Sequence, residues 1–145
     1  MAKTYRIGTG TRLINWTFRR MTELGMGASH RHILTVPGRK TGQLHSTPVD
    51  VVEYDGSRWL VAGYGPANWV ANARAARKVT LSRGGRSEKF AVEDADPADA
   101  IPVLRQYMRQ VRVTRGYFDA RPDSPDEAIA AELPRHPVLR LSRPP

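Results

Sequence analysis

The chain contains no cysteine among its 145 residues. That absence excludes disulfides, thiolate nucleophiles and cysteine-based metal sites. The sequence also lacks an apolar run approaching the ~20 residues that a membrane-spanning helix needs. It shows no charged start followed by an apolar stretch and a small-residue cleavage site, so we expect a cytoplasmic protein. We expect residues 1–145 to form a single domain, because this length supports one hydrophobic core.

Recognisable catalytic motifs are missing as well. The sequence contains no HExxH, GxSxG or GxGxxG pattern, no legible Ser-His-Asp grouping and no cluster of carboxylates. Paired histidines at 30 and 32 lack a third ligand nearby, so we expect no metal site. A chain without its own acid–base or nucleophilic machinery is expected to take its chemistry from a bound cofactor.

Acidic residues are scarce in the first third of the chain. Residues 1–45 hold eight Lys/Arg and one acid, Glu23, so this third carries +7 of the net charge of +9. A partner for this region should be anionic, such as a phosphorylated cofactor, a membrane surface or a nucleic acid. Apolar residues at helical spacing predict an amphipathic helix over residues 10–26. This helix could pack on the domain, cover a pocket or rest on anionic lipid, which leaves peripheral membrane association open.

Alternating hydrophobic residues predict short strands at residues 30–36, 44–54, 58–62, 79–83, 88–92 and 138–141. Asp55-Gly56 and Gly84-Gly85 predict hairpin turns. Pro48 cannot donate a ladder hydrogen bond, so it indicates an edge, a bulge or the start of pairing. Helices are expected at residues 68–77, at 97–111 after Asp96, and at 124–133, where Ser124 and Glu127 resemble a capping box. Hairpins without regular βαβ alternation favour an α+β fold, with an antiparallel sheet closing on itself and helices at the periphery.

Two turns have chemistry suited to an anionic ligand. Gly38-Arg39-Lys40-Thr41-Gly42 offers a guanidinium, an ammonium, a hydroxyl and backbone N–H groups at one bend. It is not a P-loop, and taken alone it also fits a solvated hairpin turn. Gly63-Tyr64-Gly65-Pro66 opens onto the expected helix at 68–77, with Trp59 and Trp69 nearby. Together the turns suit a large planar ligand with a charged tail.

Four stretches of the sequence match a known family. They are residues 33–42 with the Gly-Arg-Lys-Thr-Gly loop, Thr47-Pro48-Val49, residues 59–65, and Trp69-Val70-Ala71-Asn72. This pattern resembles the deazaflavin-dependent nitroreductases of actinobacteria, which are A-type split β-barrel flavin/deazaflavin oxidoreductases. The likeness covers about residues 10–141. The loop followed by Thr-Pro is its specific part.

The resemblance implies a split β-barrel that binds the reduced deazaflavin coenzyme F-420. It implies that the enzyme transfers a hydride to a quinone, an activated alkene (enone) or a nitro-aromatic compound, and that it acts as a monomer with no nucleic-acid partner. The loop would hold the phosphate and polyglutamate tail, and Pro48 and Val49 would lie along the deazaflavin ring. The full set of implied cofactor-binding residues is Arg39, Lys40, Thr41, Gly42, Ser46, Pro48, Val49, Ala62, Gly63, Tyr64, Gly65, Trp69 and Asn72. Tyr64 and Tyr117 are candidate proton donors or substrate contacts.

The sequence departs from the family pattern at one turn. Family members often have Ser-Lys-Gly-Gly where this chain has Gly63-Tyr64-Gly65-Pro66. The difference removes a cation from the tail site and places a phenol near it. Two other functions remain open from the sequence. They are a non-catalytic module that binds nucleic acid or an anionic membrane through the basic N-terminal third, and a split-barrel reductase that uses FMN.

Overall fold

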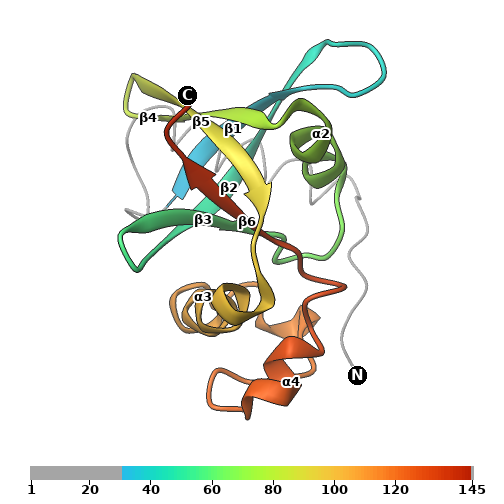
Figure 1. The fold of residues 1–145 in the computed structure, drawn as a ribbon, viewed down its shortest axis with the longest axis vertical. Helices are drawn as coiled ribbons and strands as arrows, with labels where there is room; N and C mark the ends of the chain where they lie inside the picture. The colour runs from blue at the N-terminus through green and yellow to red at the C-terminus, as the bar shows by residue number, and fades with distance from the viewer. Residues whose placement is uncertain (1–30, 145) are drawn as a thin grey trace.

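The computed structural model describes residues 31–144. Its six strands close into an antiparallel barrel in the order β1-β2-β3-β6-β5-β4 (Figure 1). The strands are β1 (Arg31–Pro37), β2 (Leu44–Tyr54), β3 (Ser57–Val61), β4 (Lys78–Arg83), β5 (Arg86–Asp94) and β6 (Val138–Ser142). The other elements are α2 (Asn68–Ala76), α3 (Pro97–Gln110), the 3-10 turn η1 (Arg115–Tyr117) and α4 (Asp126–Ala130). The predicted α+β barrel with peripheral helices is therefore confirmed. The expected helix at 10–26 lies outside the described residues.

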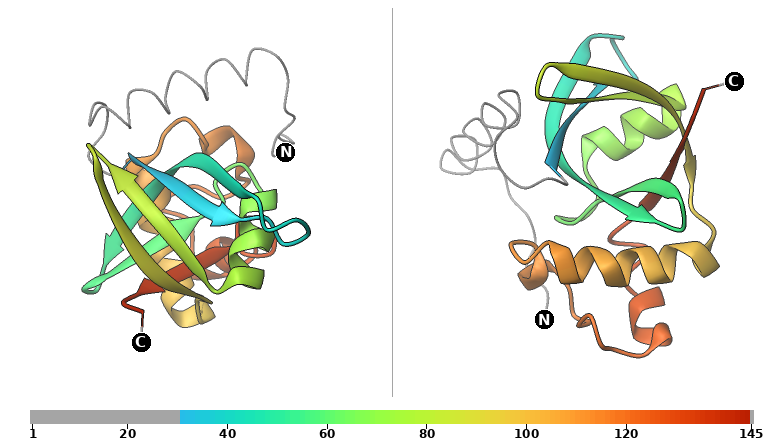
Figure 2. Two further views of the ribbon diagram at one scale, coloured as in Figure 1. Left: turned by 90° about the horizontal axis from the view of Figure 1, so that it is seen from above. Right: turned by 90° about the vertical axis from the view of Figure 1, so that its left-hand side faces the viewer.

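Alternating side chains on β3 and β6 help to build two hydrophobic cores on opposite faces of the barrel wall. On β3, Leu60 packs inside the barrel, whereas Trp59 and Val61 pack on its outer face. On β6, Leu139 and Leu141 likewise face inward. Successive strand side chains point to opposite faces, so one strand can serve both cores. The outer core lies beneath α3, which runs across one end of the barrel (Figure 2).

Strand β2 changes neighbours halfway along its length. Residues 44–50 pair with β1, and residues 51–54 pair with β3. Within the described part of the chain, no strand pairs with the second edge of residues 44–50. Pro48 sits in this half, opposite Ile33, which fits an edge position, one of the three alternatives that the sequence left open for a residue without an N–H donor. The half-paired strand leaves room for a cavity beside it.

The turns agree with the sequence, but the expected cap of the last helix does not. Asp55 and Gly56 both have positive φ (51° and 74°), as a two-residue hairpin turn requires. Helix α4 ends at Ala130 rather than near residue 133, and its N-cap is Pro125 without a side-chain cap. Ser124 Oγ instead accepts a hydrogen bond from the backbone N–H of Arg121, 2.9 Å away. The capping box was therefore wrong, because a local turn takes the hydroxyl that the box would have used.

One of the contacts between helix α3 and the barrel is unusually close. Tyr107 on α3 is 3% exposed, and its ring reaches the backbone at Gly63, just after β3. A Cβ added at Gly63 would lie 1.8 Å from the Tyr107 hydroxyl oxygen and 2.7 Å from its ring carbon Cζ. Atoms cannot approach this closely, so only glycine permits this packing.

We expect Gly63→Ala to lower the free energy of unfolding by about 1–3 kcal/mol, the usual cost of overpacking a core. Thermal or denaturant unfolding followed by circular dichroism measures the loss. In a Tyr107→Phe background the same change should cost less, because the closest atom has been removed. An equal cost in both backgrounds would show that the contact with the hydroxyl is not the cause.

Candidate functional site

One cavity of about 670 Å³ collects most of the residues that the sequence singled out. It runs beside the half-paired strand β2, from the β1–β2 loop to the segment that follows β3. Its lining comes from four segments: the loop after β1, residues 45–50 of β2, residues 61–65, and the start of α2, together with Tyr107 from α3. Its volume lies within the range of small-molecule sites, roughly 300–1,000 Å³.

The cationic loop is a closed turn held by its own backbone. The Gly38 N–H donates to the Gln43 carbonyl (2.8 Å), and the Gly42 N–H donates to the Gly38 carbonyl (2.9 Å). Gly42 has φ +74°, a conformation that glycine adopts without strain. Thr41 Oγ1 accepts the Gln43 N–H at 3.2 Å. These bonds fix the bend while Arg39 and Lys40 remain exposed.

Arg39 is anchored to helix α2 through a single amide oxygen. Asn72 Oδ1 accepts hydrogen bonds from the Arg39 backbone N–H (3.1 Å) and from the Arg39 Nη1 (2.8 Å). Asn72 itself is buried at 5% exposure, so its position is set by the packing of α2 against the barrel. The bond to a charged donor is of the stronger kind, and it holds the guanidinium at the wall of the cavity.

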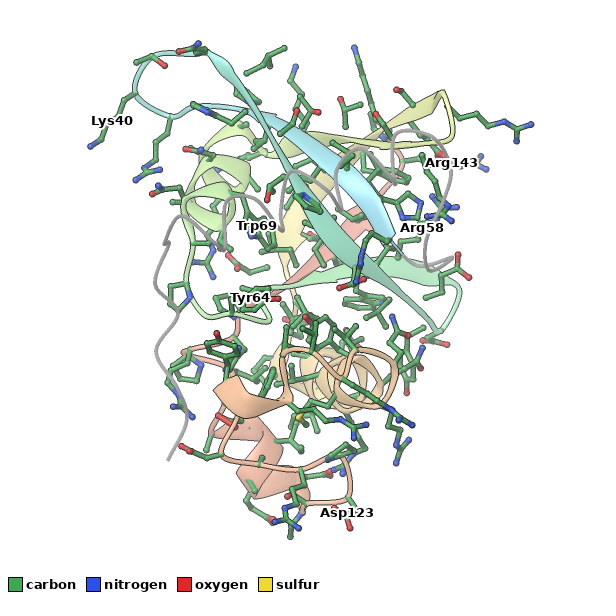
Figure 3. All side chains as sticks on the ribbon, turned by 180° about the vertical axis from the view of Figure 1, so that it is seen from behind. Lys40, Arg58, Tyr64, Trp69, Asp123 and Arg143 are labelled. Atoms are coloured by element: carbon green, nitrogen blue, oxygen red, sulfur yellow. The ribbon has the colours of Figure 1, made fainter. Side chains whose placement is uncertain are left out.

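The middle of the cavity is apolar, and its walls are rigid. Pro48 and Val49 come from β2, and Trp69 comes from the first turn of α2. Trp69 is partly buried and packs against the core inside the barrel. Figure 3 shows Lys40, Trp69 and Tyr64 following one another down one side of the molecule. This arrangement gives a cationic end, an apolar middle and a phenolic end.

The far end of the cavity holds a pair of tyrosines. Tyr64 lines the cavity and is 39% exposed. Tyr117 does not belong to the lining; its ring packs edge-on against Tyr64, with centroids 5.1 Å apart and planes at 75°. Such T-shaped pairs are favourable arrangements of two aromatic rings. Of the two phenols that the sequence proposed, Tyr64 therefore faces the cavity and Tyr117 supports it.

An ion pair and a buried phenol stand beside these tyrosines. Asp50 lines the cavity, and its Oδ1 lies 3.4 Å from Arg31 Nε. Burial raises the pKa of the Tyr107 hydroxyl well above its ordinary value, and the neighbouring Asp50 charge adds to this shift. The hydrogen bond between Tyr107 and Thr114 opposes it. Tyr107 therefore stays protonated near neutral pH and can act there as a hydrogen-bond donor.

The sequence predicted most of the residues that line this cavity, but not the polar residues Tyr107 and Asp50. Twelve of the thirteen residues implied as cofactor-binding line the cavity, and Gly42 is the exception. Tyr107 and Asp50 were not proposed. Tyr107 follows Val103 by four residues on the buried face of α3, a spacing that could have drawn attention to it. Asp50, a lone acid between Val49 and Val51 on a strand, was the corresponding signal on β2.

The family model of the F420H(2)-dependent quinone reductases matches residues 11–125. The match covers more than half of the 145 residues, and the chain belongs to this family. It is therefore an oxidoreductase that depends on reduced coenzyme F-420. Among proteins with curated descriptions, none matches the sequence at a significant level.

Solved structures show the same fold at low sequence identity. An F420-H2 dependent reductase (FDR-A) is 18% identical, covers 79% of this chain and 95% of its own, and has a TM-score of 0.50. A NimC/NimA family protein from Clostridium acetobutylicum is 15% identical, with 94% and 83% coverage and a TM-score of 0.55. A FAD-binding protein from Mesorhizobium loti is 14% identical, with 85% and 86% coverage and a TM-score of 0.51. The split barrel is thus shared by proteins described as binding different cofactors.

The chemistry of the cavity fits a reduced deazaflavin with an anionic tail. Arg39 and Lys40 supply positive charge at one end, and Pro48 and Trp69 supply flat apolar surface in the middle. No helix in residues 31–144 has the length and hydropathy to cross a bilayer.

Removing the Asn72 amide should loosen the cationic loop. We expect Asn72→Ala to lower the free energy of unfolding by about 0.5–1.5 kcal/mol, the net value of a hydrogen bond, because Arg39 is exposed and water can replace the lost acceptor. Hydrogen exchange followed by NMR should show faster exchange of the Arg39 amide. Asn68→Ala on the exposed side of the same helix is the matched control and should leave that amide unchanged. Equal Arg39 exchange in both variants would contradict the anchoring role.

Proposed function

We propose that this protein transfers a hydride from reduced coenzyme F-420 to a small-molecule acceptor, namely a quinone, an activated alkene or a nitro-aromatic compound. The observation that carries the proposal is the convergence of the 38–42 loop, the edge of β2, residues 62–65 and the start of α2 on one cavity. The family match supports reduced F-420 as the cofactor. The cavity lining supports the roles proposed below for individual residues. A quinone is the first acceptor to test, because the matching family is described by it.

The residues take distinct roles in this proposal. Arg39, Lys40, Thr41 and Gly42 bind the phosphate and glutamate tail through charge-assisted bonds and backbone N–H groups. Pro48, Val49 and Trp69 lie along the ring system, and Asn72 holds Arg39 in place. Ser46, Ala62, Gly63 and Gly65 complete the wall. When bound, the reduced cofactor supplies the hydride.

The acceptor must also gain a proton. A quinone that takes up a hydride becomes an oxyanion, and one proton makes it a hydroquinone. We assign that proton to the Tyr64 hydroxyl, because Tyr64 is exposed on the cavity wall and Tyr117 holds its ring from the side. The protein must also keep the acceptor within ~3–3.5 Å of the hydride donor, which the apolar walls favour by excluding water.

Titration of tryptophan fluorescence with each ligand tests the cofactor directly, because Trp69 lines the cavity. We expect reduced F-420 to quench the emission at lower concentration than FMN. Tighter binding of FMN would favour a flavin-dependent reductase on the same barrel. Salt-dependent binding of DNA or anionic liposomes, with neither cofactor bound, would replace the proposal with a non-catalytic anion-binding module.

Substitution of the loop cations should weaken cofactor binding. We expect Arg39→Ala and Lys40→Ala each to raise the Kd for reduced F-420. The loss of binding free energy should be about 1–3 kcal/mol, the value of a charge-assisted bond. Lys78→Ala is the matched control, because Lys78 is an exposed cation on β4 away from the cavity. If both loop variants bind as the wild type does, the loop is not the tail site.

Removal of the Tyr64 hydroxyl should slow turnover without weakening the cofactor. We expect Tyr64→Phe to lower kcat with a soluble benzoquinone by roughly 100-fold, the lower range for a lost general acid. The Kd for reduced F-420 should stay within about twofold. Tyr54→Phe removes a phenol outside the cavity lining and serves as the control. An unchanged kcat in the Tyr64 variant would assign the proton to water or to Ser46.

The oligomeric state remains a separate prediction. The expected monomer follows from the resemblance, whereas one structure with the same fold is described as a domain-swapped dimer. That structure is 16% identical, covers 92% of this chain and all of its own, and has a TM-score of 0.52.

A further inference from the structure

A buried histidine links the two segments that carry the tyrosine pair. His136 precedes β6 and is 1% exposed. Its Nδ1 lies 2.8 Å from the Ala62 carbonyl oxygen, and its Nε2 lies 2.9 Å from the Tyr117 carbonyl oxygen. The ring stacks on Phe118, with centroids 3.7 Å apart and planes at 16°. Both ring nitrogens are thus within hydrogen-bond distance of an acceptor that has no proton to give.

The two contacts tie the ring to two backbone segments. A ring nitrogen that carries a proton donates to the carbonyl oxygen that it faces. The Phe118 ring covers one face of the imidazole, so the ring is held from the side as well as at its nitrogens.

We propose that His136 is the positioning residue for the Tyr64–Tyr117 pair. One bond fixes Ala62, which lines the cavity two residues before Tyr64. The other fixes the backbone of Tyr117, whose ring packs against Tyr64. A single side chain therefore sets the spacing between the two tyrosines. This inference rests on the role proposed above for Tyr64, but the hydrogen bonding of the ring can be measured without any cofactor.

The charged side chains of Glu132 and Arg135, close to His136 in the sequence, have partners in the same region of the structure. Glu132 Oε2 accepts the backbone N–H groups of Asp119 (2.7 Å) and Ala120 (2.9 Å). Arg135 pairs with both Glu132 and Asp119. Tyr107 on α3 contacts Phe118, the ring that stacks on His136, with 6.3 Å between the Tyr107 and Phe118 ring centroids. Glu132 thus fixes the loop beyond Phe118, and His136 fixes it before Phe118.

The first test reads the ring nitrogens by NMR in the full chain, without cofactor, at neutral pH. With 15N-labelled histidine, we expect one ring to show an N–H signal that is protected from exchange with water, because its donor is bonded to a backbone carbonyl. Loss of that signal in His136→Gln assigns it; if this variant does not fold, nuclear Overhauser contacts to the Phe118 ring assign it in the wild type. The remaining histidines serve as internal references. A His136 ring N–H that exchanges as fast as those of the other histidines would overturn the proposal.

The second test asks whether His136 acts through Tyr64. We expect His136→Gln to lower kcat with a soluble benzoquinone about tenfold in the wild-type background, and less than twofold in a Tyr64→Phe background. The Kd for reduced F-420 should change less than twofold. Equal losses in both backgrounds would mean that His136 has only a general structural role, because independent effects add. If the wild type reduces no quinone, the proposed function fails, whereas the NMR result still decides whether the His136 ring is held by its two carbonyl partners.

Discussion

Strand β2 has a different neighbour at each end, and the site follows from this constraint. Residues 44–50 pair with β1 on one edge, and residues 51–54 pair with β3 on the other. The barrel therefore closes through the middle of one long strand. Six consecutive residues, 45–50, line the cavity. In a fully paired strand, a neighbouring chain would occupy the space that this edge opens to a ligand. Pro48 fits there because it has no N–H to offer a neighbour.

The rest of the site is attached to this edge by side chains whose own positions are fixed by packing. Asn72 is buried on α2 and holds Arg39, so the cationic loop is tied to a helix rather than to solvent. Tyr107 is buried under the barrel and reaches Gly63, so the segment after β3 rests on α3. Functional groups placed this way are more precisely located than groups on free loops. The cavity thus has a rigid wall, although much of its lining comes from connections.

The sequence allowed the framework of the site to be predicted, because that framework depends on local signals. Alternating residues located every strand to within about two residues, the usual uncertainty at element ends, and the Asp55-Gly56 turn fixed one hairpin. The Gly-Arg-Lys-Thr-Gly loop and the Thr-Pro that follows it marked the cavity lining. Contacts between distant segments carried no such signal. His136 pairs with residues 74 and 19 positions away, and Glu132 with residues 12 and 13 positions away. Neither His136 nor Glu132 lies in a recognisable motif, so only the folded structure shows which backbone groups each side chain contacts.

The tyrosine pair shows why the departure from the family pattern at residues 63–66 matters. A lysine at position 64 would carry its charge on a flexible stem and could reach an anionic tail from many directions. Tyr64 instead carries a rigid ring that gains from a fixed neighbour, and Tyr117 supplies that neighbour at 5.1 Å. A T-shaped contact depends on spacing, and the spacing here is set by backbone segments that are 53 positions apart in sequence, at 64 and 117. Such segments need a common anchor, and His136 contacts the backbone of both. With a phenol in place of a cation, the function of this turn therefore depends on the position of the ring rather than on its charge.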